Sequence, residues 1–180
     1  MTLKRPSSSR ALYDRHIFMT RIDSPADFAA VVPTGALIGL DPGTKTIGVA
    51  ISDERRNHAS PLETIRRTRL TDDLKHLSTL IEHRQAKGIV VGMPLNMDGS
   101  AGRRAQSVRA FTRSLEDTFN LPVLQWDERL STFTADEAMK EAGVRRDKRA
   151  AAIDSAAAAI ILQGALDRLS ELTLDTRETE

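Results

Sequence analysis

The chain contains no cysteine, which excludes disulfide bonds, thiol nucleophiles and thiolate metal sites. It also lacks a long hydrophobic run, because the longest apolar segment, residues 156–162, is far shorter than the roughly 20 residues that span a bilayer. The four histidines do not have the spacing of a catalytic zinc site, and we assign them no role. These absences favour a soluble protein of the reducing cytoplasm that does not enter a membrane.

A strong charge of one sign is also absent, because the formal net charge is only +1. Arginines nevertheless gather in three places, at 66–69, 103–113 and 145–149. The last 14 residues carry five acids against two arginines. Each basic cluster taken alone is explained as solvated surface charge. Together they are consistent with a basic face that meets a phosphate-rich partner.

The length of 180 residues suits one α/β domain. Residues 1–34 are rich in Arg, Ser and Pro without sustained periodicity, so we predict a poorly ordered N-terminal extension, although residues 26–32 suit a short helical turn. We place the folded domain at 35–170. Residues 171–180 are predicted to form an acidic C-terminal tail.

The hydrophobic pattern predicts a five-stranded mixed sheet flanked by helices. Segments 36–41, 46–52 and 61–67 alternate with short connections, which suits antiparallel pairing. The later strands are separated by helices, as parallel crossovers require. The later elements are predicted as a helix from 71 to 88, a strand at 89–91, a helix at 105–119, a strand at 122–126, and helices at 134–143 and 150–169.

Acidic residues follow two of the predicted strands. Asp41 ends the first strand, and Asp127 and Glu128 end the fifth. In open α/β sheets, ligand sites lie outside the carboxyl ends of the parallel strands. Alternation along a strand points Asp127 and Glu128 to opposite faces, so one of them belongs to the site. We favour Glu128, whose side chain is longer, and keep Asp127 as the alternative.

A third acid, Asp154, lies in the last predicted helix on a line with Ala158, Ile161 and Ala165, a face that is otherwise apolar. Two carboxylates about 4 Å apart repel by about 4 kcal/mol at an effective dielectric of 20, so three of them converge only if one is protonated or a cation is bound. Oxygen ligands suit Mg²⁺ or Mn²⁺, and a pair of such ions supports phosphodiester hydrolysis. A turn, an ion pair with Arg129 or a helix dipole would explain each acid separately.

Several other residues are candidates for contacts with nucleic-acid phosphates. The loop after the fourth strand contains an Asp98-Gly99 turn whose free amides suit a phosphate, and a plain surface loop is an equally good interpretation. Helix capping is the safer interpretation for the hydroxyls after Arg129. The full candidate set is Lys45, Asn96, Ser100, Arg129, Ser131, Thr132, Arg145, Arg146 and Arg149.

Four segments, 39–50, 91–100, 127–132 and 153–157, resemble in order the signatures of the YqgF family. Its members are RNase H-like and are also described as RuvC-type Holliday junction resolvases. The resemblance covers about residues 36–166. It implies an RNase H-like sheet of strand order 3-2-1-4-5, whose acids are Asp41, one of the pair at 127–128, and Asp154. The chain departs from the pattern at Thr46, where we expect an arginine that contacts phosphate or forms an ion pair.

The resemblance also implies the function, a metal-dependent nuclease that matures the 5′ end of pre-16S ribosomal RNA in the bacterial cytoplasm. Two alternatives remain open: an endonuclease that cleaves branched DNA, and a non-catalytic RNA-binding factor of ribosome assembly. The segment 41–45 also resembles the first phosphate loop of actin-like ATPases, but those enzymes need two such domains. The protein is expected to be a monomer or a homodimer.

Overall fold

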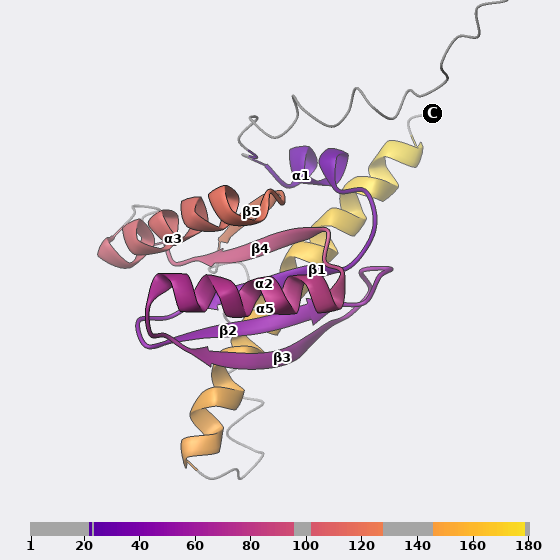
Figure 1. Ribbon diagram of the computed structural model, residues 1–180. Helices are drawn as coiled ribbons and strands as arrows, with labels where there is room; N and C mark the ends of the chain where they lie inside the picture. The colour runs from indigo at the N-terminus through magenta and orange to yellow at the C-terminus, as the bar shows by residue number, and fades with distance from the viewer. Residues whose placement is uncertain (1–21, 23, 96–101, 128–145, 179–180) are drawn as a thin grey trace, which may run out of the picture.

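The computed structural model describes residues 22, 24–95, 102–127 and 146–178, with the backbone alone at 146–151 and 175–178. Figure 1 shows a sheet with helices on both faces. The elements, in chain order, are α1 (Pro25–Val31), β1 (Leu37–Pro42), β2 (Thr46–Ser52), β3 (Ala59–Arg66), α2 (Leu70–Arg84), β4 (Gly88–Met93), α3 (Arg103–Phe119), β5 (Val123–Asp127) and α5 (Arg146–Glu178).

The five strands form one mixed sheet of order β3-β2-β1-β4-β5. The first three pair antiparallel as a meander, whereas β1 pairs with β4, and β4 with β5, in parallel. Helix α2 leads the chain from β3 to β4, and α3 leads it from β4 to β5. The predicted α/β class and the strand order 3-2-1-4-5 are therefore confirmed.

The two faces of the sheet are covered by different helices (Figure 1). Ile38 and Leu40 of β1 point into a core that also contains residues of α2 and α3. Leu37, on the alternate face, belongs to a second core with α1 and α5. Because side chains alternate along a strand, Gly39 and Asp41 share the face of Leu37. Asp41 is therefore placed at the end of β1 on the face that α5 covers.

Helix α5 crosses that face closely because glycine lines its path. A β-carbon at Gly39 would lie 2.7 Å from the Leu162 Cβ and 3.1 Å from the Ala158 carbonyl oxygen. Real Cβ atoms essentially never approach closer than 3.0 Å, so no larger residue fits at Gly39 without moving the helix. The small residues of the sequence therefore set the spacing between α5 and the sheet.

Helix α1, which lies where the sequence suits a short helical turn at 26–32, packs on the domain (Figure 1). Ser24 caps α1 by accepting a hydrogen bond from the Asp27 amide, and Pro25 follows at the first helical position. Phe28 is completely buried in the core beside α5. The packed part of the chain therefore includes residues 25–31, because a single aromatic residue anchors a segment of weak periodicity.

The last helix is longer than the one predicted at 150–169. Helix α5 continues through the predicted acidic tail to Glu178, since no proline or glycine follows Gly164 to end it. The helix predicted at 134–143 lies outside the described residues. Within the described part of the chain, no helix has the length and apolar character that crossing a membrane requires.

Candidate active site

The carboxyl end of β1 holds a carboxylate in an unfavourable environment. The Asp41 side chain is only 17% exposed, and its Oδ1 atom has no hydrogen-bond partner among the described residues. Burial raises the pKa of the Asp41 carboxyl above its ordinary value of 3.8, and the nearby charge of Asp154 adds to this rise. The Arg104 guanidinium acts in the opposite direction. A buried carboxylate oxygen without a partner is a suitable ligand for a cation.

Asp154 reaches this edge because Gly48 lets α5 approach β2. In the β1–β2 ladder, Gly48 pairs directly with Asp41, so the two residues lie side by side on the same face. A β-carbon at Gly48 would overlap the backbone carbonyl of Asp154. Further along α5, Ala158, Ile161 and Ala165 are buried, as the predicted apolar face requires. The structure thus brings Asp41 and Asp154 together from positions more than 100 residues apart.

Arg104 is the third charged group at this edge, and it is not among the site residues that the sequence predicts. Its Nη2 atom lies 3.8 Å from Asp41 Oδ1, which is an ion-pair distance but too long for a hydrogen bond. The side chain is 56% exposed and comes from the first turn of α3. The available signal was its position just after the loop that follows β4, because such loops open at the same sheet edge.

Asp127 ends β5 on the face of the sheet opposite Asp41. Leu124 and Trp126 are buried against α5, so Asp127 points to the opposite face. Asp127 pairs in register with Met93, which belongs to the core beneath α2 and α3. Asp127 is therefore not on the face that carries Asp41. The preferred acid, Glu128, lies outside the described residues.

Lys45 is exposed in the turn between β1 and β2, close to Asp41 in sequence. The neighbouring residue Thr46 pairs with Arg66 at the end of β3, which adds another cation to this edge. Of the other phosphate-binding candidates, only the helical backbone of Arg146 and Arg149 is described. The remaining candidates lie outside the described residues, and they are Asn96, Ser100, Arg129, Ser131, Thr132 and Arg145.

The donors at this edge have the chemistry of a site for a hard divalent cation. Carboxylate oxygens are the ligands that Mg²⁺ and Mn²⁺ prefer, and Asp41 offers an oxygen without a hydrogen bond. Asp154 supplies a second carboxylate beside it. Among the described residues no group of three acidic, histidine or cysteine side chains is close enough to hold a metal ion.

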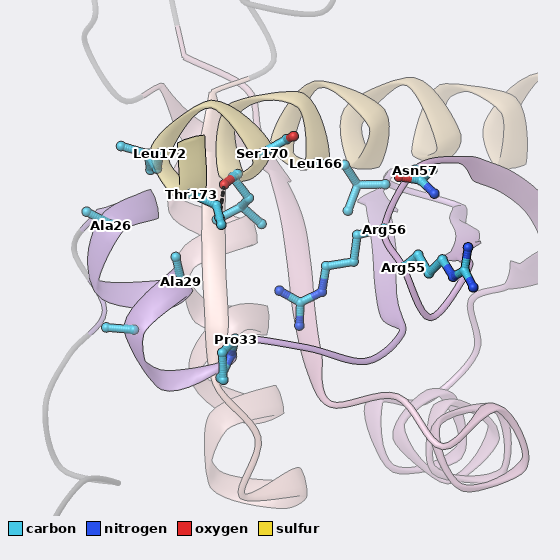
Figure 2. Close-up of a pocket in the computed structure, with 12 residues that line it drawn as sticks. Ala26, Ala29, Pro33, Arg55, Arg56, Asn57, Leu166, Ser170, Leu172 and Thr173 are labelled. Carbon is cyan, nitrogen blue, oxygen red and sulfur yellow. Dashed lines mark hydrogen bonds between the residues drawn. The ribbon is translucent and has the colours of Figure 1, made fainter. Parts of the chain in front are cut away.

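A cavity of about 630 Å³ lies at the other end of the sheet, between α1, the β2–β3 connection and α5 (Figure 2). It is lined largely by alanine and leucine side chains from α1 and α5. Arg56 donates hydrogen bonds to the carbonyl oxygens of Val32 and Gly35, at 2.7 and 2.8 Å, so its guanidinium ties the α1–β1 connection to the hairpin. None of the acids discussed above lines this cavity.

The strand order and the helices on both faces of the sheet define an RNase H-like fold. Two solved structures share this fold at low sequence identity. The RuvC protein of Thermus thermophilus in complex with a Holliday junction substrate gives a TM-score of 0.51 at 13% identity, covering 73% of this chain and 93% of that one. The yeast mitochondrial Holliday junction resolvase Ydc2 gives a TM-score of 0.53 at 15% identity, covering 95% and 90%.

Sequence relatives are much closer. A protein of Rhodobacter capsulatus named "Putative pre-16S rRNA nuclease" is 57% identical over 147 residues, which cover 81% of this chain and 92% of the relative. A protein of Agrobacterium fabrum with the same name is 53% identical over 141 residues, covering 78% and 89%. The family model of RuvX, described as Holliday junction resolvase, matches residues 35–168. The chain belongs to the RuvX family, also called YqgF, as its four motifs predicted.

Proposed function

We propose that this protein is a metal-dependent nuclease that processes the 5′ end of pre-16S ribosomal RNA. The observation that carries the proposal is the juxtaposition of Asp41 and Asp154 at the carboxyl end of β1, with an Asp41 oxygen that lacks a hydrogen bond. Buried like charges persist at such a position when a cation compensates them. The nuclease domain in this proposal spans residues 35–170, and the family match at 35–168 supports it.

Asp41, Asp154 and Glu128 would hold the divalent ions, Mg²⁺ or Mn²⁺. Glu128 is preferred over Asp127 because Asp127 points away from the face that carries Asp41. When bound, such ions supply a nucleophilic water and stabilise the oxygen that leaves the phosphorus. The protein would contribute the fixed spacing of the carboxylates, which Gly48 permits by letting α5 approach the sheet.

The basic groups around these acids would contact the nucleic-acid backbone. Arg104 lies 3.8 Å from Asp41, Lys45 lies in the turn that follows β1, and both side chains are exposed. The further phosphate contacts that we propose come from the segment after β4, the segment after β5 and the start of α5. They involve Asn96, Ser100, Arg129, Ser131, Thr132, Arg145, Arg146 and Arg149. Ribosomal RNA is the proposed substrate because relatives above 50% identity carry the name of a pre-16S rRNA nuclease. Processing of this RNA places the protein in the cytoplasm during ribosome biogenesis.

The substrate experiment incubates the purified protein with a pre-16S rRNA fragment that retains its 5′ extension, and in parallel with a four-way DNA junction. Each substrate is tested with Mg²⁺, with Mn²⁺ and with excess EDTA. The proposal predicts cleavage of the RNA fragment in both metals and none in EDTA. The Asp154→Asn variant serves as the control for contaminating nucleases, and it should leave the RNA intact.

Two other outcomes would redirect the assignment. Cleavage of the junction in preference to the RNA would favour a resolvase, which the description of the family and the shared fold of RuvC make the main alternative. Tight RNA binding with no cleavage in either metal would favour a non-catalytic assembly factor. RNA cleavage that persists in EDTA would contradict the metal site itself.

A further inference from the structure

Arg67 lies just beyond the end of β3 and contacts the turn that follows Asp41. Its Nη1 atom donates a 2.8 Å hydrogen bond to the Gly43 carbonyl oxygen, and its backbone amide donates a 2.9 Å hydrogen bond to the Lys45 carbonyl oxygen. The Gly43 amide in turn donates to the Asp41 carbonyl oxygen at 3.1 Å. Arg67 therefore holds both sides of the turn that carries the candidate metal ligand.

The same guanidinium is anchored to α2 and α3, the two helices that cover the face of the sheet opposite α5. Its Nε atom lies 3.7 Å from Oδ2 of Asp73, a carboxylate in the first turn of α2 that is only 3% exposed. The other oxygen of Asp73, Oδ1, accepts a 3.1 Å hydrogen bond from the Thr68 amide. The guanidinium also lies over the ring of Phe111 in α3, 5.4 Å from its centroid.

These contacts require an arginine. A planar guanidinium can donate to a carbonyl, pair with a carboxylate and lie against an aromatic face at the same time, whereas the ammonium of lysine is a flexible point charge. With only 24% of its side chain exposed, Arg67 is committed to protein contacts and is poorly placed to bind a substrate phosphate. Its role differs in this respect from that of the more exposed Arg104.

We infer that Arg67 is a positioning residue for the nuclease site: it fixes the turn after Asp41 against α2 and α3, and thereby sets where the Asp41 carboxylate stands. The inference rests on the proposed function for its catalytic consequence but not for the clamp itself. A misplacement of about 1 Å at a reacting group costs on the order of 100-fold in rate, so a loosened turn should reduce kcat strongly.

The test compares two variants. Arg67→Met keeps a long unbranched side chain but removes the guanidinium, whereas Arg67→Lys keeps the positive charge. The matched control is Arg84→Met, which removes the same charge from an exposed position in the last turn of α2. Hydrogen exchange by mass spectrometry reports on the peptide 41–46, and steady-state cleavage of the RNA fragment separates kcat from KM. A thermal unfolding curve for each variant establishes that it is folded at the temperature of the assays.

We expect Arg67→Met to accelerate exchange in the peptide 41–46 and to lower kcat by about tenfold or more with a smaller change in KM. Arg67→Lys should recover part of both effects, and Arg84→Met should match the wild type. A raised KM with unchanged kcat and unchanged exchange would overturn the inference, because it would indicate a substrate contact. Unchanged exchange and unchanged kcat would overturn it as well. If the wild type cleaves no RNA, the proposed function fails, while the exchange data still decide whether Arg67 clamps the turn.

Discussion

The carbonyl group of Asp154 occupies the space that a β-carbon would need at Gly48, and Gly48 is the direct partner of Asp41 in the β1–β2 ladder. One missing side chain thus lets a helix bring a second acid to the first. The juxtaposition depends on the helix lying close to the sheet, so it should be sensitive to a single methyl group.

Gly48→Ala should push α5 away from β2 at Asp154 and lower the rate of RNA cleavage by about tenfold or more, because the two acids separate. Overpacking of this kind costs about 1–3 kcal/mol of stability, measurable by urea denaturation. The control is Gly39→Ala, which also meets α5 but does so at Ala158 and Leu162, one and two turns beyond Asp154. Equal activity losses per folded molecule in the two variants would argue that spacing at Asp154 has no special role.

The stability of the metal-free protein should depend on pH through Asp41. Its pKa is raised on folding, so the folded state holds the proton more tightly than the unfolded state does. The resulting stabilisation is complete below the ordinary value of 3.8 and is lost as pH rises through the raised pKa of the folded state. The free energy of unfolding in EDTA should therefore fall with pH more steeply in the wild type than in Asp41→Asn. Parallel curves would contradict the burial of this charge.

Arg104→Ala should weaken RNA binding because one phosphate contact is removed. A plot of the logarithm of the association constant against the logarithm of the salt concentration should become less steep by about 1. The substitution should also raise the pKa of Asp41 further, since the Arg104 charge now opposes the rise. Filter binding over a range of salt concentrations measures the slope. Arg84→Ala is the control, because it removes the same charge from an exposed position in the last turn of α2. An unchanged slope in Arg104→Ala would exclude Arg104 from the RNA contact.

Phe28→Ala should destabilise the domain by about 3–5 kcal/mol, the usual cost of removing a fully buried aromatic side chain. This would establish that α1 belongs to the packed domain. Val31→Ala, on the same helix, is the control: Val31 is 39% exposed, so its truncation should change stability by about 0.5 kcal/mol or less. Urea denaturation monitored by circular dichroism measures the stability of both variants. Equally small effects would show that α1 does not contribute to the stability of the domain.

Most of the sheet was predictable from the sequence, because its strands are short apolar segments bounded by clear turn and helix signals. The location of Asp41 at this edge of the sheet was predicted from the direction of the strands. The apolar face of α5 was predicted from the helical spacing of its residues. Arg104 was not predictable as a neighbour of Asp41, because the reach of an exposed arginine depends on where α3 starts relative to β1. The anchoring of α1 through Phe28 was missed for a related reason, since one buried ring produces no periodicity.

The central claim is that Asp41 is a ligand in a divalent-metal nuclease site, and single-turnover cleavage of the pre-16S rRNA fragment tests it most directly. The wild type and Asp41→Asn are compared at the same enzyme concentration in Mg²⁺, after thermal unfolding has shown that both are folded. The account predicts that the variant cleaves at least about 1,000-fold more slowly, because a charged ligand of the ion is lost. Cleavage by Asp41→Asn at the rate of the wild type would contradict it.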